Sequence, residues 1–299
     1  MMNTIQTVGI ISPGDMGHIV GQVLRQNGLR VITCLQGRSP RTQQLAKQAG
    51  IIDVGTEQVL VQEADIILSI LVPAQAKMAA QRIADEIQEN GANLLYVDCN
   101  AIAPATVQEI AAIISQAGGR FVDASIIGPP PRKPGTTRFY AAGPDVEEFA
   151  QLTQFGLEIP ILGNEIGQAS AIKMCYAALT KGTTALCTEL LTAAQALGVA
   201  DALDAEFQQS QPLMHKRMQG LPNMPAKSRR WVGEMEEIAQ TFAAVGLTPK
   251  ILEGAADIYR FVGQTALADR TPEETSPLPT AAEMTATLAE SLHTERRPM

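Results

Sequence analysis

The first half of the chain alternates short apolar runs with stretches of helical periodicity. Apolar runs that predict β-strands cover residues 7–12, 30–36, 65–72, 93–98 and 120–127. Helical stretches separate them, among them 16–28 and 39–50, and in the second of these Ser39 is placed to cap the helix and Pro40 takes the first helical position. Strands that alternate with helices indicate a parallel sheet with helices on both faces. Two further runs, 136–143 and 158–163, are expected to extend this sheet at one edge.

The pattern changes after Gly163. Residues 166–197 contain no proline and are dominated by alanine and leucine, which predicts one helix on the order of 45 Å long. Because it is apolar on nearly every side, we expect it to be buried on several sides. Further helices are predicted at 201–219, 227–244, 248–268 and 280–293, with a polar linker at 269–280. The sequence thus predicts a parallel-sheet α/β domain (1–164), then an all-helical domain (165–299), with the long helix between them.

Composition excludes several classes of partner. The net charge is −8, the pI is about 5.0 and no basic tract occurs, so nucleic acid is not an expected partner. The four cysteines form no C-x-x-C pair and lie near no histidine at zinc spacing, which predicts no metal site and a reduced, cytoplasmic protein. The N-terminus has no positively charged region before a long apolar run, and no apolar run reaches the roughly 20 residues of a membrane helix. We therefore expect neither a signal peptide nor a membrane partner.

The turn between the first predicted strand and helix carries the first candidate chemistry. It reads Ser-Pro-Gly-Asp-Met-Gly, one substitution from the G-x-G-x-x-G turn of Rossmann-type dinucleotide-binding domains. Gly14 holds the position that lets the backbone approach a pyrophosphate, and Gly17 the position that lets the helix pack on the strand. Ser12 replaces the first glycine, which a turn tolerates if the φ angle of the serine is negative.

The remaining residues of the turn are less typical. Pro13 stiffens it, and Asp15 would repel a pyrophosphate, so we expect Asp15 to cap the helix. The N–H groups at the start of the helix would still attract phosphate. The alternative is a purely structural turn. The predicted cofactor loop is Ser12, Pro13, Gly14, Asp15, Met16 and Gly17.

The end of the second predicted strand indicates which dinucleotide binds. NAD-binding domains usually carry an acidic residue there for the ribose 2′-hydroxyl, but this chain has Arg38, Ser39 and Arg41. A guanidinium group can bind a 2′-phosphate through two hydrogen bonds and can stack on adenine. These residues favour NADP(H) as the cofactor, unless both arginines are simply solvated.

These motifs resemble those of the β-hydroxyacid dehydrogenases, relatives of 6-phosphogluconate dehydrogenase and of the imine reductases. The resemblance extends from the first strand to about residue 265. The cofactor loop of that family reads G-x-G-x-M-G, and Met16 and Gly17 match its end. The family's fourth strand ends in D-x-S-T followed by proline, which is matched by Asp98, Asn100 and Pro104.

Two later motifs match in part. A family strand ends in an anion-binding S-G-G loop followed by a G-T pair. Here Gly128 matches, Gly135 and Thr136 supply the pair, and Ile127 and Pro129 replace the serine and one glycine.

The long helix carries the most informative match. In the family it begins G-x-G-x-x-x-x-x-K, and Lys173 falls on the catalytic lysine. Tyr176 and Ala177 replace the asparagine pair that often follows, and Gly233 stands roughly where a second family lysine would be. These departures indicate an uncharacterised branch of the superfamily.

The resemblance implies that Lys173 is a general acid/base. Burial of a lysine in an apolar helix favours the neutral amine, which suits proton exchange near neutral pH. Asn100, with a donor and an acceptor, and Tyr176, nearly one turn beyond Lys173, complete the predicted catalytic set. The alternatives are a solvated lysine, an asparagine that forms a turn and a core tyrosine.

The helical domain adds candidates for the substrate. Trp231 is the only tryptophan, and Arg230 beside it can bind an anion that the altered S-G-G loop does not. The alternatives are a core tryptophan with solvated arginines, or a different substrate, and His215 is expected to be structural. The predicted substrate-binding residues are Asn100, Gly128, Pro129, Lys173, Arg230 and Trp231. The predicted cofactor contacts beyond the loop are Arg38, Ser39, Arg41, Leu71, Val72 and Asn100.

The sequence therefore predicts an NADP(H)-dependent oxidoreductase for a small polar, hydroxyacid-like alcohol or carbonyl. The cofactor carries the hydride and the protein supplies placement and the proton. An NADPH-dependent imine reductase and a non-catalytic NADP-sensing protein are the alternatives. The resemblance further implies a homodimer that forms through the helical domain.

Overall fold

The computed structural model describes residues 4–271, 274 and 276–294. It divides into two compact units, residues 1–174 and 175–299, so that the division falls inside the long helix. The predicted linker at 269–280 lies partly outside the described residues, which do not include 272, 273 and 275.

The first unit contains an 8-stranded sheet in the order β3-β2-β1-β4-β5-β6-β7-β8. Neighbouring strands are parallel except for β6 and β7, which are antiparallel. Together with the all-helical second unit, this confirms the predicted fold class. The strands are β1 (Thr7–Ile11), β2 (Arg30–Thr33), β3 (Ile52–Asp53), β4 (Ile66–Ser69), β5 (Leu95–Asp98), β6 (Arg120–Ile127), β7 (Arg138–Ala142) and β8 (Ile161–Gly163).

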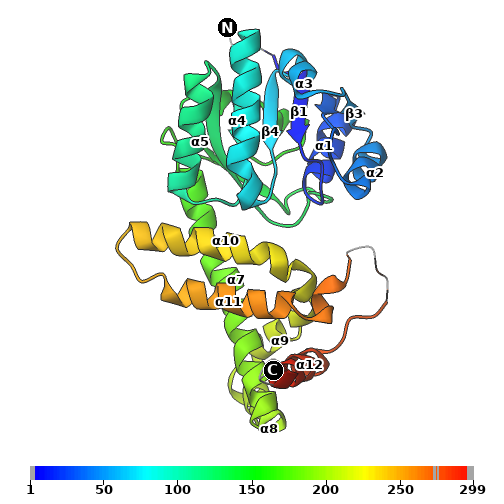
Figure 1. The fold of residues 1–299 in the computed structure, drawn as a ribbon, viewed down its shortest axis with the longest axis vertical. Helices are drawn as coiled ribbons and strands as arrows, with labels where there is room; N and C mark the ends of the chain where they lie inside the picture. Colours follow the sequence, from blue (N-terminus) through cyan, green and yellow to red (C-terminus); the bar gives the residue numbers. More distant parts are fainter. Residues whose placement is uncertain (1–3, 272–273, 275, 295–299) are drawn as a thin grey trace. The chain divides into compact units, whose positions relative to one another are not determined.

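Helices cover both faces of this sheet because side chains alternate along each buried strand. One core cluster joins Val8 and Ile10 of β1 to the first group of helices, and the other joins Ile67 of β4 to the second group. In Figure 1, α4 and α5 lie side by side on the second face. The first group is α1 (Gly17–Gln26), α2 (Pro40–Ala49) and α6 (Val146–Ala150), with the 3₁₀ helix η1 (Gln151–Phe155); the second is α3 (Glu57–Glu63), α4 (Pro73–Asn90) and α5 (Pro104–Gln116).

The register of the central strands brings their carboxyl ends together. Ile11 of β1 pairs with Ser69 of β4, Ser69 with Asp98 of β5, and Asp98 with Asp123 of β6. Since the carboxyl ends of parallel strands lie together, the segments that follow β1, β4 and β5 lie side by side. The strand order reverses between β1 and β4. Open α/β sheets bind ligands at such a point.

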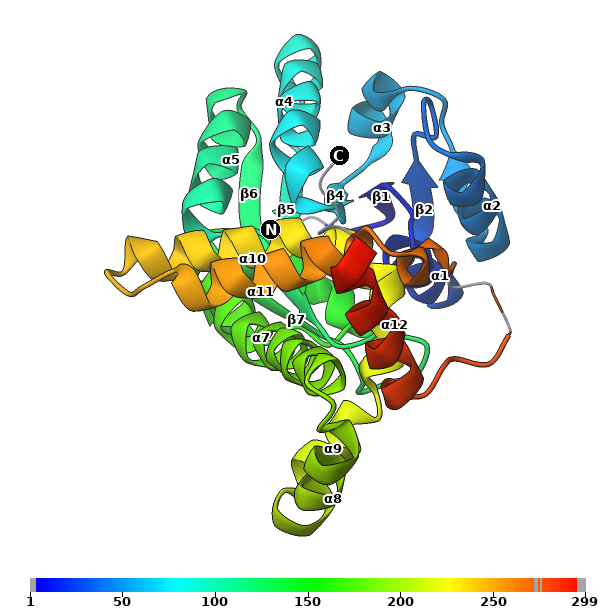
Figure 2. The same ribbon diagram turned by 60° about the horizontal axis from the view of Figure 1, so that its bottom comes forward.

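The second unit is helical. The long helix α7 (Gln168–Ala196) has 29 residues, and α10 and α11 form an antiparallel pair that lies side by side in Figures 1 and 2. The other elements are α8 (Ala200–Ser210), α9 (Pro212–Met218), η2 (Leu221–Asn223), α10 (Pro225–Ala244), α11 (Lys250–Gly263), η3 (Ala266–Asp269) and α12 (Ala281–Thr294).

Two helix predictions in this unit were wrong in detail. The stretch predicted as one helix at 201–219 is broken at Gln211, because Pro212 has no N–H and opens a new helix. The stretch predicted at 248–268 ends its α-helix at Gly263 and continues as the short 3₁₀ helix η3.

Two global properties bear on the sequence expectations. All four cysteines are free thiols. Among the residues that the structure describes, no helix combines the length and the apolar character needed to span a membrane.

Candidate functional site

The turn after β1 has a conformation that the sequence did not predict. Ser12 has a φ angle of +63°, so the negative φ that would let serine replace glycine without strain is not met. The carbonyl oxygen of Ser12 accepts the N–H of Gly14 at 2.7 Å. The serine therefore occupies the left-handed conformation that glycine adopts without strain.

The two glycines of the turn differ in the space around them. A Cβ atom on Gly17 would lie 2.8 Å from the carbonyl oxygen of Ser12, whereas a Cβ on Gly14 would meet no atom within 4 Å. Gly17 therefore permits the close packing of helix on strand, and the backbone at Gly14 borders open space. This difference fits a turn that receives a diphosphate beside Gly14.

The start of α1 supplies the donors for such a group. The first helical bond runs from the N–H of His18 to the carbonyl oxygen of Gly14 at 3.0 Å, and the Nδ1 of His18 lies 2.6 Å from the same oxygen. The N–H groups of Asp15, Met16 and Gly17 precede this bond and have no acceptor within the helix. They can bind an anion at the positive end of the helix dipole.

Asp15 does not cap α1, so the expectation that it would was wrong. No side chain caps the helix at Met16, and the Asp15 carboxylate forms an ion pair with Arg41 of α2 at 2.5 Å. The side chain of Arg41 is 41% exposed and that of Asp15 is 62% exposed. The carboxylate near the predicted diphosphate site is thus neutralised by an arginine that the sequence predicted to bind the 2′-phosphate.

The end of β2 presents a second polar cluster. Ser39 accepts the N–H of Thr42 and Pro40 takes the first helical position, which confirms the predicted cap. Arg38 is half-buried, and burial first, then the nearby Arg82, lowers the pKa of its guanidinium. Sequence reasoning missed Arg82, a residue of α4, because its 44-residue separation from Arg38 leaves no local signal.

Asn100 is buried at the carboxyl end of β5 and its amide is bonded to the protein. Its Oδ1 accepts the N–H of Leu71 at 2.5 Å, while its Nδ2 donates to Ser69 at 3.1 Å and to Asp98 at 2.9 Å. These bonds hold the segment that contains Leu71 and Val72 against the end of β5. Asn100 thus ties the segment after β4 to the end of β5, and its Oδ1, which accepts one bond, keeps a second lone pair.

Two buried carboxyl groups lie on neighbouring strands beneath this network. Burial raises the pKa of Asp98 to about 7, even though bonds from Asn100 oppose the rise. Asp123 accepts the N–H groups of Gly167, Ala169 and Ser170 at 2.8–3.1 Å and the hydroxyl of Ser170 at 2.8 Å. Asp123 therefore caps α7, a role that sequence reasoning missed.

Lys173 lies one turn beyond this cap. Its Nζ donates to the carbonyl oxygen of Ile126, near the end of β6, at 2.5 Å, and the side chain is half-buried. The strand is followed by Gly128, whose Cβ would lie 2.3 Å from the oxygen of Thr136. The carbonyl of Pro129 accepts the hydroxyl of Thr137 at 2.5 Å. The structure therefore brings Lys173 to the end of the strand from which Gly128 and Pro129 continue.

The other predicted residues belong to the second unit. Tyr176 is 50% exposed, and Arg230 lies 3.7 Å from the carboxylate of Glu234. Trp231 packs edge-on against Tyr259, with 5.2 Å between the ring centroids. Separately, the Nε2 of His215 lies 2.8 Å from Asp204.

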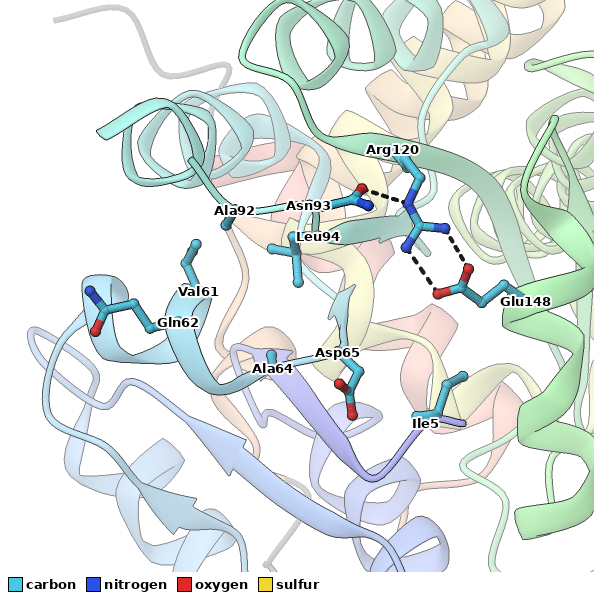
Figure 3. A pocket seen from close by; sticks show the side chains of 10 residues that line it. All are labelled: Ile5, Val61, Gln62, Ala64, Asp65, Ala92, Asn93, Leu94, Arg120 and Glu148. Carbon is cyan, nitrogen blue, oxygen red and sulfur yellow. Dashed lines mark hydrogen bonds and ion pairs between the residues drawn. The ribbon is translucent and has the colours of Figure 1, made fainter. Parts of the chain in front are cut away.

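A cavity of about 240 Å³ lies where the parallel strands begin, at the end of the sheet opposite to their carboxyl ends (Figure 3). Ile5 and Asp65 precede strands β1 and β4 there, and Arg120 begins β6. Arg120 forms ion pairs with Glu148 and Asp145, so its charge is already compensated. This cavity lies away from the carboxyl ends of the strands. No group of three or more metal-ligating side chains occurs in the described part of the chain.

Comparisons with known proteins agree with this geometry. The NAD binding domain of 6-phosphogluconate dehydrogenase matches residues 7–155, and a domain of unknown function, DUF1932, matches residues 194–262. The solved protein MTH1747, of unknown function but structurally similar to 3-hydroxyacid dehydrogenases, is 32% identical. It covers 87% of this chain and 100% of its own, with a TM-score of 0.64.

Two further relatives are more distant. An uncharacterised 28.5 kDa protein of Methanothermus fervidus is 27% identical over 85% of this chain and 98% of its own length. The 3-hydroxyisobutyrate dehydrogenase of Mycobacterium tuberculosis shares the fold, at 19% identity, with a TM-score of 0.67 over 98% of this chain and 100% of its own. The first unit is therefore an NAD(P)-binding domain of Rossmann type. The chain belongs to the 6-phosphogluconate dehydrogenase-like superfamily, which confirms the resemblance read from the sequence.

Proposed function

We propose that the protein is an NADP(H)-dependent oxidoreductase that interconverts a small, polar, hydroxyacid-like alcohol and its carbonyl form. The observation that carries the proposal is that two features lie at the carboxyl ends of the strands. The turn at Gly14 borders open space beside the N–H groups that begin α1, and Lys173 reaches the carboxyl end of β6. The family to which the chain belongs supports the same chemistry.

The residues at the end of β2 support NADP(H) over NAD(H). Arg38 and Ser39 would hold the 2′-phosphate, and residues 34–41, which follow β2, contain no acidic residue that could accept a ribose 2′-hydroxyl. Arg41 would join the phosphate site by exchanging its partner Asp15. When bound, the nicotinamide supplies or accepts the hydride.

Lys173 supplies the proton in this proposal. Its bond to the carbonyl oxygen of Ile126 fixes the direction of the side chain at the strand end. As a neutral amine it accepts the hydroxyl proton during oxidation, and as an ammonium it returns that proton during reduction. Asn100 keeps the floor of the site rigid by holding Leu71 against β5.

We also propose that the protein is a homodimer that forms through its helical unit. Three apolar side chains on α7, Tyr176, Leu179 and Leu186, are 50%, 67% and 59% exposed. Their spacing of three and seven residues places them along one stripe of the helix. A second copy of the chain would cover this stripe.

An activity screen tests the proposed function. With NADPH we expect turnover of small ketoacids, loss of that turnover in Lys173→Met, and unchanged turnover in Lys47→Met, an exposed lysine of α2. NADPH binding should be similar in all three proteins, so that the defect lies in proton transfer. Turnover of cyclic imines alone would instead identify an imine reductase. Binding of NADPH with no turnover of either class would identify a sensor.

A further inference from the structure

The second unit contains a smaller cavity, of about 130 Å³, that lies entirely within it. Its lining includes Arg217 of α9, Lys227 and Trp231 of α10, and Thr184 of α7. The cavity is large enough for a molecule of a few non-hydrogen atoms. Two cations, both on exposed residues, and an aromatic ring therefore border a small hollow that opens to solvent.

The charge of this cavity is not balanced by the protein. Within the described part of the chain, none of its lining residues is acidic, and Lys227 forms no ion pair there. Arg217 donates to a neutral group, the carbonyl oxygen of Thr180, at 3.1 Å. Burial, and next the neighbouring Arg230, lowers the pKa of Lys227.

The nearby acid is already committed elsewhere. Glu234 is buried and forms an ion pair with Lys181, and it also lies 3.7 Å from Arg230. The 240 Å³ cavity of the first unit differs in this respect, because its arginine, Arg120, has two acidic partners. A positive pocket of this kind in a chain of net charge −8 is a local feature that would attract anions.

The aromatic wall of the cavity is held in place. Trp231 packs edge-on against Tyr259, whose hydroxyl donates to the carbonyl oxygen of Lys181 at 2.6 Å. The ammonium group of Lys181 lies 5.5 Å from the centre of the indole ring. These contacts fix the ring before any ligand arrives, which lowers the entropic cost of binding.

We propose that this cavity binds a small oxyanion, a carboxylate or a phosphate, between Arg217 and Lys227, with the remainder of the ligand against Trp231. The guanidinium group matches the two oxygens of such an anion, and Lys227 adds a point charge. The site goes beyond the proposed oxidoreductase activity, because binding there requires neither the dinucleotide nor Lys173.

The chain carries its own probe for this site, since Trp231 is the only tryptophan. The protein is titrated, without dinucleotide and at constant ionic strength, with malonate and with inorganic phosphate while tryptophan fluorescence is recorded. We expect a saturable change with at least one anion, with a Kd on the order of 1 mM. Arg217→Gln and Lys227→Gln should each weaken binding by about tenfold or more.

Matched controls separate a site from general charge screening and from misfolding. Lys216→Gln removes the same charge from α9 but does not line the cavity, so it should titrate as wild type does. Lys173→Met should also titrate normally, which keeps this result independent of the dehydrogenase proposal. The same anion should raise the Tm of the wild type and not that of Lys227→Gln. The proposal is overturned if chloride produces the same fluorescence change, or if both cavity variants titrate as wild type does.

Discussion

At the scale of single residues, the arginines of the proposed cofactor site differ in the charges around them. Arg41 is paired with Asp15, whereas Arg38 lies near a second cation, Arg82, which forms an ion pair with Glu57 at 3.0 Å. Arg38 is therefore the residue with the most to gain from an added phosphate.

The first prediction concerns Arg38. We expect NADPH to bind at least about tenfold more tightly than NADH, a difference of about 1.4 kcal/mol, and Arg38→Ala to erase the preference. Arg30→Ala, which removes an exposed arginine paired with Glu63 at the start of the same strand, should keep it. Equilibrium titration with both dinucleotides measures this. Equal affinities in the wild type would contradict the assignment of Arg38.

A second residue-scale prediction concerns Asp98. Burial raises its pKa from 3.8 to about 7, so the folded state binds a proton that the unfolded state releases between these values. Its stabilising contribution is present below pH 4 and is lost as the pH rises through about 7. The free energy of unfolding should therefore fall over this interval by up to about 4 kcal/mol relative to Asp98→Asn, which cannot ionise. Denaturant titrations across pH test this, with Asp85→Asn, an exposed acid of α4, as the control. Parallel pH profiles for wild type and Asp98→Asn would refute it.

At the scale of elements, the connection between β6 and α7 determines where Lys173 lies. The Asp123 carboxylate satisfies three N–H groups that a helix leaves without partners, and it lies at the positive end of the helix dipole. The hydroxyl of Ser170 donates to the same carboxylate, and Lys173 follows one turn later along α7. The strand thus fixes the rotation of the helix about its axis.

Removal of this cap should be costly. We expect Asp123→Ala to lower the free energy of unfolding by about 3 kcal/mol, since several buried donors lose their acceptor. Asp123→Asn, which keeps one acceptor oxygen, should lose about half as much. Chemical denaturation of the variants measures both, and a loss below about 0.5 kcal/mol for Asp123→Ala would show that water replaces the carboxylate.

The elements also show how far the sequence can predict this fold. Apolar runs located the central strands, and Ser39 with Pro40 located the start of α2 because these signals are local. The break at Pro212 was also local but was outweighed by the helical pattern on both sides. The partners of Asp15 and Asp123 could not be predicted, because Arg41 and Ser170 lie 26 and 47 residues away and only the fold brings them near.

At the scale of the whole molecule, the exposed stripe on α7 leads to a prediction about assembly. Light scattering should give one species at twice the chain mass of 31.9 kDa. Leu186→Arg should give monomers, because it introduces a charge into the proposed interface. Met78→Arg alters a side chain that is 61% exposed on α4, outside the stripe, and should leave the dimer intact. A wild type that is monomeric at micromolar concentration would rule the interface out.

The central claim is that the serine-containing turn receives a dinucleotide. Gly14→Ala tests it most directly, because a Cβ there meets no protein atom within 4 Å and fills only the space assigned to the diphosphate. Calorimetric titration with NADPH, together with Tm, should show tight binding by the wild type. The variant should have the same Tm and an affinity at least about tenfold lower. Equal affinity in the two proteins, or no binding of NADPH by the wild type, would contradict the account.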